Sequence, residues 1–228
     1  MNNTFKHSGK YGDLVLGLPV VMQLGGGDFY LLKYQYSAIG ELLERQPYIK
    51  NVIPIEEDKW DKLVPKYNLD LFRKDNDISI IKMHLKTFNI DFDLEQPWLF
   101  NIEPLSISKI VIHDTSIGTS PGYTVNWELL RGREKDCIFV SYSDGEYENF
   151  VSHRKLNIAR YKPKNLYEVA RVIAGSQLFV CNQSCPYTIA EGLKVPLVLD
   201  LYIGKPQYPL GKSGFTDLSE EILERFVK

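Results

Sequence analysis

The sequence predicts an α/β protein built from two small Rossmann-like, doubly wound lobes with a cleft between them. Three observations lead to this prediction. Short apolar runs of strand length alternate with helical patterns in both halves of the 228-residue chain. Small polar residues follow several of these runs directly, as they do at the carboxyl ends of parallel strands. Prolines punctuate the stretch 96–104, so we expect an N-terminal lobe at 1–104 and a C-terminal lobe at 105–228.

Composition argues against several classes of protein. The 27 basic and 29 acidic residues nearly cancel, so the overall charge does not indicate a nucleic-acid or membrane-surface protein. The three cysteines, Cys137, Cys181 and Cys185, form no C-x-x-C pair, which favours reduced thiols over disulfides or zinc ligands. With no signal peptide and no apolar run long enough to span a bilayer, we expect a soluble cytoplasmic protein.

The first lobe begins with a predicted strand at 4–7 and a glycine-bearing loop at 8–13. The apolar spacing of residues 14–24 predicts a helix, and Pro19 inside it is expected to kink the helix or shorten its start. The loop lacks the spacing of a P-loop and of G-x-G-x-x-G. It places Asp13 where its carboxylate either caps the helix or faces the cleft, and propensity alone favours the cap.

The rest of the first lobe alternates less regularly. Strands are predicted at 29–32 and 51–55, with a helix at 39–43 between them and an acidic helix start at 56–58. Residues 59–77 fit either a helix or a hairpin. Residues 78–89 predict a clearer helix, with Ile81, Leu85 and Phe88 on one side.

The second lobe alternates clearly. Strands are predicted at 109–113, 137–141, 156–159, 178–181 and 197–199. Helices are predicted at 127–130, through Tyr147 and Phe150, at 165–174, at 187–193 and at 217–226. The last of these has a box-like pairing of Asp217 with Glu220. We expect its apolar face to pack partly against the first lobe.

Residues 178–200 are the most informative stretch, because a strand, a polar turn, a helix and another strand follow one another there. Such a βαβ unit binds ligands at the carboxyl ends of its strands. The backbone N–H groups at the helix start, joined by the side chains of Gln183 and Ser184, suit an anion such as a diphosphate. The alternative is that Ser184 only caps the helix, and this stretch alone favours the cap.

Two motifs in a fixed order resemble a known family. HSGKYGDLVLGLP at 7–19 has a strand end, a small-residue loop, Gly-Asp and an apolar stretch ending in Leu-Pro. LFVCNQSCPYTIAEGLKVP at 178–196 has a strand, a polar turn, a helix and a proline-led strand. Together they resemble glycosyltransferase family 9, the heptosyltransferase-like group with the two-lobed GT-B fold. Similar blocks at 137–150 and 165–196 extend the resemblance over most of the chain, which looks like a compact, divergent member.

The resemblance implies an inverting glycosyltransferase that moves a sugar from a nucleotide-activated donor to an acceptor hydroxyl, with no metal and no other cofactor. Asp13 would be the general base that takes the proton of the acceptor. The leaving diphosphate would be held by the polar turn and the helix start behind it. The implied donor-side residues are Gly12, Thr115, Ser116, Ser141, Tyr142, Asn182, Gln183, Ser184 and Glu191, and the acceptor-side residues are Ser8 and Lys10.

The implied acceptor is a saccharide of an envelope polymer, and the alternative is a modified base in DNA. Five basic residues are candidates to replace a phosphate-binding lysine of the family, although a solvated basic face is their ordinary interpretation: Arg154, Lys155, Arg160, Lys162 and Lys164. Thr188 stands where the family carries a histidine. That difference favours a second hypothesis, a nucleotide-binding module of the same fold that has lost catalysis. A nucleotide-sugar epimerase is a third hypothesis.

The four histidines do not cluster in the sequence. His7 and His113 end predicted strands and could line the cleft, His84 falls in a predicted helix, and His153 falls in a basic loop. Core or surface positions are the ordinary interpretation of each, so we expect no metal site.

Overall fold

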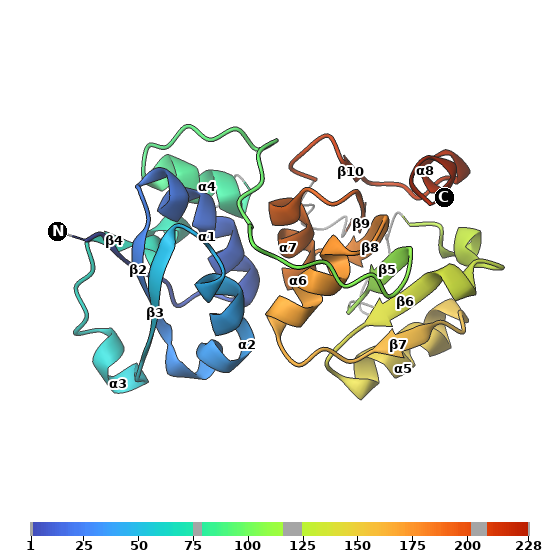
Figure 1. Ribbon diagram of the computed structural model, residues 1–228, viewed down its shortest axis with the longest axis horizontal. Coiled ribbons are helices and arrows are strands. Elements are labelled where there is room, and N and C mark those ends of the chain that lie inside the picture. Colours follow the sequence, from blue (N-terminus) through green and yellow to red (C-terminus); the bar gives the residue numbers. More distant parts are fainter. Residues whose placement is uncertain (1, 75–78, 116–124, 202–208, 228) are drawn as a thin grey trace. The chain divides into compact units, whose positions relative to one another are not determined.

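The computed structural model describes residues 2–74, 79–115, 125–201 and 209–227, and it divides the chain into two units. Unit 1 comprises Met1–Ile102 together with Asn165–Tyr167, and unit 2 comprises Glu103–Lys164 and Glu168–Lys228. Figure 1 shows each unit as a sheet with helices packed against it. The division after Ile102 falls close to the boundary expected at 104.

Unit 1 is built on a four-stranded parallel sheet in the order β3-β2-β1-β4. Its elements are β1 Thr4–Lys6, α1 Tyr11–Gln23, β2 Gly27–Leu32, α2 Lys33–Glu44, β3 Ile49–Ile55, α3 Glu57–Trp60, β4 Tyr67–Asn68, the 3₁₀ helix η1 Leu69–Lys74 and α4 Ile80–Thr87. The strands β2 and β3 lie on one side of β1, and β4 lies on the other. The switch point of this doubly wound sheet therefore falls between β1 and β4.

Helix α1 begins earlier than the sequence predicts. Tyr11, Gly12 and Asp13 are already helical, Lys10 is the N-cap, and the helix continues through Pro19. Asp13 is therefore the third residue of the helix, and its interpretation as the N-cap is wrong. A carboxylate in the first turn still interacts favourably with the helix dipole.

The described part of the stretch 59–77 is neither one helix nor a hairpin, because it holds the end of α3, the two-residue strand β4 and η1. The buried side chain of Lys6 helps to hold this irregular chain. Its Nζ donates hydrogen bonds to the carbonyl oxygens of Trp60 at 3.2 Å and Leu63 at 3.0 Å, and it also lies over the Trp60 ring. Contacts from so far along the sequence leave no trace in local periodicity.

Unit 2 is built on a six-stranded parallel sheet in the order β10-β9-β8-β5-β6-β7. Its elements are β5 Ile110–His113, η2 Trp127–Leu130, η3 Glu134–Asp136, β6 Cys137–Val140, α5 Asp144–Arg154, β7 Ala159–Tyr161, α6 Leu166–Ala174, β8 Leu178–Asn182, α7 Cys185–Leu193, β9 Leu197–Asp200, β10 Gly214–Phe215 and α8 Glu220–Phe226. The first two residues of α6 fall in unit 1 and the rest of the helix in unit 2. From β5 the chain adds β6 and β7 on one side, and later β8, β9 and β10 on the other. The switch point of unit 2 lies between β5 and β8.

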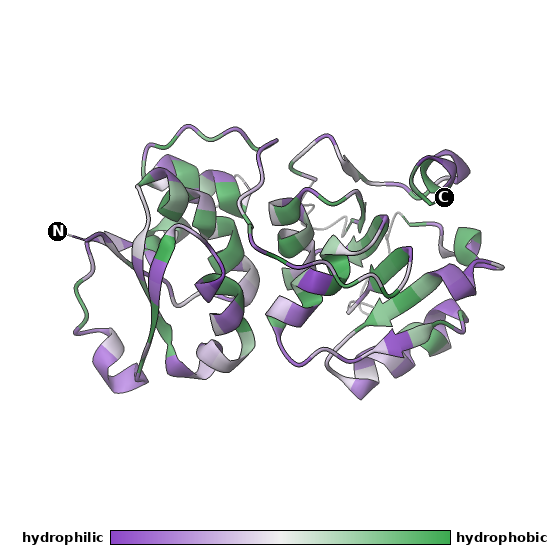
Figure 2. Cartoon of the chain, viewed as in Figure 1, coloured by the Kyte–Doolittle hydropathy of each residue, from purple (hydrophilic) through white to green (hydrophobic). Residues whose placement is uncertain are grey.

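The core of unit 2 is formed by the apolar runs that predicted its strands. Strands β5, β6, β8 and β9 are buried along their whole length, as expected of a parallel sheet covered on both faces. Figure 2 shows these strands as predominantly hydrophobic. Against them the ring of Phe150 stacks on Phe139 at 4.5 Å and meets the edge of Trp127 at 5.5 Å. The predicted strand at 156–159 lies later, as β7, because Leu156 and Ile158 contribute to this core from the preceding loop.

Helix α8 differs from its prediction at its start. Ser219 is the N-cap, and its Oγ accepts a hydrogen bond from the backbone N–H of Ile222 at 3.3 Å, so Asp217 is not the cap. The apolar side chains Ile222, Leu223 and Phe226 pack in the core cluster of unit 2. These contacts account for the apolar face of α8 within unit 2, and its partial packing on the first lobe stays a prediction.

Replacing Ser219 by alanine should therefore lower the free energy of unfolding by about 1 kcal/mol, the usual effect of losing an N-cap. Asp217→Ala is the matched control, since Asp217 is exposed and precedes the helix. Urea denaturation of the two variants measures the difference. Equal stabilities would show that Ser219 does not cap α8.

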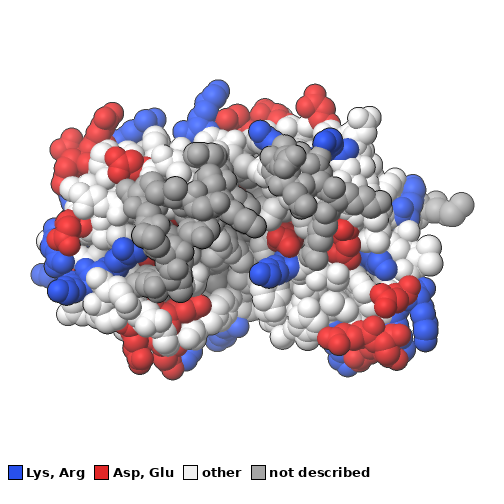
Figure 3. Space-filling model, turned by 180° about the vertical axis from the view of Figure 1, so that it is seen from behind, with Lys and Arg blue, Asp and Glu red and all other residues white. Residues whose placement is uncertain are grey.

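Charges on the surface are mixed in sign. On the face shown in Figure 3, the lysine and arginine side chains of the described residues are interspersed with aspartate and glutamate. Such a surface gives no directed field for a polyanion. Within the described ranges, no helix is both long enough and apolar enough to cross a membrane.

Candidate functional site

The switch point of unit 2 brings together polar residues that the sequence places about 70 positions apart. Asp114 and Thr115 follow β5, and Asn182 ends β8 directly beside it. Asn182 Nδ2 donates a hydrogen bond to Thr115 Oγ1 at 3.1 Å. In open α/β sheets, ligands bind in the crevice outside the strand ends at this point. Ser116, which was expected to join this group, lies outside the described residues.

Gln183 and Ser184 continue from Asn182 into α7. Ser184 occupies the N-cap position, and its backbone N–H donates to the Asn182 carbonyl oxygen at 2.8 Å. Its hydroxyl makes a longer contact of 3.4 Å with the same oxygen, and within the described chain its side chain accepts no capping bond from α7. The interpretation of Ser184 as a side-chain cap is therefore not supported. The positive end of the α7 dipole favours an anion at this position.

Ser184→Ala should weaken the binding of a nucleoside diphosphate by about 1–2 kcal/mol, the effect of losing one charge-assisted hydrogen bond. The melting temperature should hardly change, because the hydroxyl does not cap α7. Titration calorimetry and thermal unfolding measure the two quantities. Ser176→Ala is the control, since Ser176 Oγ bonds to the Ile173 carbonyl oxygen before β8, at the opposite end of that strand. Unchanged affinity with a lower melting temperature would make Ser184 a structural residue.

Two buried carboxylates lie at the same edge of the sheet. Asp114 directly follows β5 and Asp200 is the last residue of β9, and the side chains of both are fully buried. Arg154 Nη2 lies 3.0 Å from Asp114 Oδ2 and 3.7 Å from Asp200 Oδ2. Asp200 Oδ1 also accepts the backbone N–H of Val125, and the Arg154 guanidinium stacks over the Trp127 ring. One cation thus links the ends of two strands that are not neighbours.

Sequence reasoning missed Asp114 and Asp200 as a pair, and it named Arg154 only as one of five candidates for binding phosphate, with a solvated basic face as the ordinary interpretation. A signal was present, because the apolar runs VIHD and LVLD both end in aspartate. The structure places Arg154 on these carboxylates, so its charge is engaged within the protein. The described polar contacts of Arg154 are with carboxylates and do not support its candidate role in binding phosphate.

Three of the other four candidate cations form ion pairs with carboxylates of unit 2, and the fourth lies at the end of α5. Arg160 and Lys162 both pair with Asp144, and Lys164 lies 3.7 Å from Glu168. Lys155 is the exposed C-cap of α5. These residues therefore belong to a mixed surface, which agrees with the ordinary interpretation of the basic stretch.

Three further donor-side candidates follow β6 or lie within α7. Ser141 is buried at the end of β6, and its Oγ donates to the Ser143 carbonyl oxygen at 3.2 Å. The neighbouring Tyr142 is 39% exposed. Glu191 is buried within α7, where it accepts the backbone N–H of Leu210 at 2.7 Å and lies 3.6 Å from Lys194 Nζ. These two contacts of Glu191 are internal, whereas Tyr142 is partly exposed.

His113 fixes the end of β5 against β6. Its Nδ1 lies 2.7 Å from the Val140 carbonyl oxygen, which can only accept, so Nδ1 carries the hydrogen. Burial lowers the pKa of His113, although the Val140 bond and the carboxylates of Glu146 and Asp114 oppose this effect. A neutral imidazole with a fixed tautomer results.

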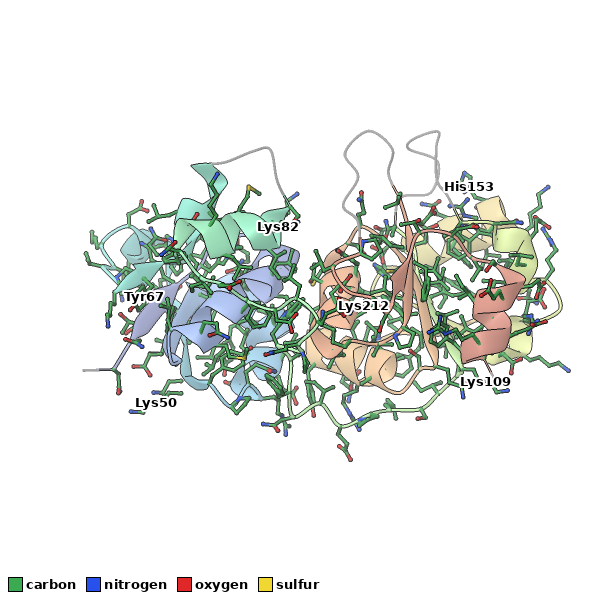
Figure 4. All side chains as sticks on the ribbon, turned by 90° about the horizontal axis from the view of Figure 1, so that it is seen from above. Lys50, Tyr67, Lys82, Lys109, His153 and Lys212 are labelled. Carbon is green, nitrogen blue, oxygen red and sulfur yellow. The ribbon has the colours of Figure 1, made fainter. Side chains whose placement is uncertain are left out.

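The other three histidines and two of the cysteines lie in positions that do not indicate a catalytic or metal-binding role. His7 and His84 are fully buried in unit 1, whereas His153 is exposed in the last turn of α5 and not in a loop. Figure 4 shows His153 at the outside of unit 2. Burial raises the pKa of the Cys137 thiol to about 12 and also raises that of Cys181, which keeps both protonated. Within the described residues, no group of three or more His, Cys, Asp or Glu side chains is arranged to hold a metal ion.

In unit 1, the candidate base lies in the first turn of α1. Asp13 is half-buried, and Gly12 precedes it inside the helix. Ser8 and Lys10, the expected acceptor-side residues, lie in the loop between β1 and α1. Lys10 is exposed, whereas Ser8 bonds to Asp70 through both its N–H and its hydroxyl, each at 2.9 Å. Asp70 was not found from the sequence.

The fold of the chain is that of known heptosyltransferases. The E. coli heptosyltransferase WaaC, solved with ADP-2-deoxy-2-fluoro heptose, matches with a TM-score of 0.67 at 12% identity, over 100% of this chain and 99% of that one. A glycosyl transferase family 9 protein from Veillonella parvula matches with a TM-score of 0.63 at 13% identity, over 99% and 88%. The E. coli ADP-heptose lps heptosyltransferase II matches with a TM-score of 0.57 at 14% identity, over 96% and 90%.

No protein-family model and no curated protein sequence matches the chain. At 12–14% identity the structural matches show the fold. They confirm the predicted α/β architecture and its heptosyltransferase-like form.

Proposed function

We propose that this protein is an inverting glycosyltransferase that moves a sugar from a nucleoside-diphosphate donor to a saccharide hydroxyl. The observation that carries the proposal is the β5–β8 switch point of unit 2. There Thr115 and Asn182 meet beside the start of α7, in a fold shared with glycosyltransferases. The structural neighbour WaaC was solved with a fluorinated ADP-heptose, which supports a nucleotide-sugar as the donor class.

In the proposed reaction, the carboxylate of Asp13 accepts the proton of the acceptor hydroxyl while that oxygen attacks the anomeric carbon. A new C–O bond forms on one face of the sugar. The bond from the anomeric carbon to the phosphate oxygen breaks on the opposite face, and the nucleoside diphosphate leaves with that electron pair. A single displacement of this kind inverts the anomeric configuration.

Unit 2 stabilises the leaving group in this proposal. The diphosphate gains negative charge as the bond breaks, and the α7 N-terminus with Gln183 and Ser184 supplies donors and a positive dipole end. Arg154 offsets part of the charge of Asp114 and Asp200, which would otherwise repel an anion at this edge. These groups act without a metal ion. In this proposal the partly exposed Tyr142 is the aromatic residue that stacks on the nucleobase.

A second candidate function is a nucleotide-binding module that has lost catalysis. The observation that favours it is Thr188, where the resemblance implies a histidine. Its Oγ1 donates to the Cys185 carbonyl oxygen at 2.7 Å and so serves the helix. A DNA acceptor finds no support in the comparisons or in the paired basic residues.

The experiment that tests the proposal is an incubation of the protein with a panel of nucleotide sugars, with and without saccharide acceptors. We expect one donor to release its nucleoside diphosphate, and the release to depend on an acceptor. Binding of a nucleoside diphosphate without release from any donor would favour the module. Absence of both binding and release would overturn the proposal.

A further inference from the structure

The loop between β1 and α1, residues 7–10, is held from two sides by residues distant in sequence. Asp70 contacts it from the segment after β4, and Gln35 contacts it from the first turn of α2. This loop lies at the switch point of unit 1 and leads directly into the helix that carries Asp13. Its geometry therefore sets where that helix starts.

Asp70 joins the loop to the neighbouring strand end. Its Oδ1 accepts the backbone N–H of Ser8 and its Oδ2 accepts the Ser8 hydroxyl, both at 2.9 Å. Asn68 Oδ1 in turn accepts the backbone N–H of Asp70 at 3.1 Å, which ties Asp70 to the last residue of β4. Burial raises the pKa of Asp70, but hydrogen bonds from His7 and Ser8 outweigh it and lower that pKa to about 2. The carboxylate is ionised throughout the physiological range.

Gln35 holds the next residue of the loop from the opposite direction. Its side chain is buried, and its Nε2 donates to the Gly9 carbonyl oxygen at 2.7 Å. Its Oε1 accepts the backbone N–H of Leu32 at 3.2 Å. Both ends of the amide are thus used, one on the loop and one on the end of β2, so the side chain has one fixed orientation.

His7, the first residue of the loop, also contacts Gly9 and Asp70. The imidazole is fully buried against Phe72 and His84, and Gly17 of α1 leaves room for both histidine rings. His7 Nδ1 lies 2.9 Å from the Gly9 backbone nitrogen and 3.1 Å from Asp70 Oδ1. A bare Nδ1 accepts from Gly9, and a protonated Nδ1 donates to Asp70, so either state ties the ring to this network.

Helix α1 starts at once after these contacts, since the Leu14 N–H bonds to the Lys10 carbonyl oxygen at 3.1 Å. We propose that Asp70 and Gln35 are positioning residues that hold the 7–10 loop so that α1 presents Asp13 to the acceptor hydroxyl. The inference rests on the proposed function of Asp13 and deepens it. A base displaced by about 1 Å loses on the order of 10²-fold in rate, so rigid support of this loop matters for transfer.

The test compares Asp70→Ala and Asp70→Asn with the control Asp28→Ala. Asp28 lies near the start of β2, at the amino end of the parallel strands, whereas the 7–10 loop lies at their carboxyl end. The hydrogen bond described for its side chain is with Asn51. We expect kcat to fall about 10–100-fold for Asp70→Ala, less for Asp70→Asn, which keeps one acceptor oxygen, and not at all for the control. The affinity for the donor should stay unchanged in all three. Gln35→Met should lower kcat in the same way.

A double-mutant cycle separates positioning from a general structural role. If Asp70 acts through Asp13, Asp70→Ala should not slow transfer further in an Asp13→Asn background. The inference would be overturned if the reductions in kcat of the two single variants multiplied in the double variant. It would also be overturned if Asp70→Ala had the same kcat as Asp28→Ala.

A readout that needs no turnover distinguishes this failure from failure of the proposed function. Amide hydrogen exchange of residues 8–13 should accelerate in Asp70→Ala and remain unchanged in Asp28→Ala, at equal global stability. If the wild-type protein transfers no sugar, the proposed function fails and exchange alone tests the support of the loop. Unchanged exchange in Asp70→Ala would overturn it.

Discussion

Replacing Asp13 by asparagine is expected to slow sugar transfer by about 10²–10⁴-fold, the usual contribution of a positioned general base. Asparagine has nearly the same shape but cannot accept the proton of the acceptor hydroxyl. Asp13 is the third residue of α1 and Lys10 is its N-cap, so the substitution leaves the N-cap residue unchanged. The affinity for the donor should stay near that of the wild type, because the proposed donor groups belong to unit 2.

The measurement is the steady-state rate of nucleoside-diphosphate release in the presence of acceptor. Asp58→Asn is the matched control, because Asp58 also lies in the first turn of a helix in unit 1 and is exposed. The control should transfer sugar at the wild-type rate. An Asp13→Asn protein as fast as the control would leave Asp13 without a catalytic role.

The second large effect is expected on stability, from Arg154→Met. This change keeps much of the aliphatic bulk over Trp127 but removes the charge that faces two fully buried carboxylates. Removing one partner of a buried ion pair typically costs about 3–5 kcal/mol, because an uncompensated charge remains. Urea denaturation should show this loss. Arg131→Met, at the exposed pair with Glu128, should show little change.

A second substitution tests the cause of that loss. Asp200→Asn in the Arg154→Met background removes one of the two stranded charges and should recover part of the stability. The single Arg154→Met variant should also lose stability as pH rises, because its buried carboxylates then resist ionisation. An additive double mutant would show that Arg154 acts mainly through packing.

Much of the fold follows from local patterns. The strands β5, β6, β8 and β9 are apolar runs buried on both faces, and such runs need no partner information to be recognised. The prediction for the stretch after α3 was wrong because β4 has only two residues and the chain before it is bonded to Lys6, which lies more than 50 positions earlier in the sequence. The predicted start of α1 was wrong because Gly12 and Asp13 are typical of loops, whereas both are already helical in the structure.

The candidate site was predictable where strand order alone decides it. Thr115 and Asn182 end neighbouring parallel strands, so their meeting follows from the topology once both strands are recognised. The contacts of Arg154 and Asp70 were not predictable, because each residue bonds to a partner 40 or more positions away in the sequence. Charge pattern in the sequence cannot distinguish an arginine that faces solvent from one that faces two buried carboxylates.

The configuration of the transferred sugar tests the central claim most directly. With the donor found in the nucleotide-sugar panel, proton NMR of the first product formed reports the anomeric configuration before any equilibration. A single displacement assisted by Asp13 predicts a product of opposite configuration to the donor, formed in step with one equivalent of nucleoside diphosphate. A product that retains the donor configuration would contradict the proposed mechanism.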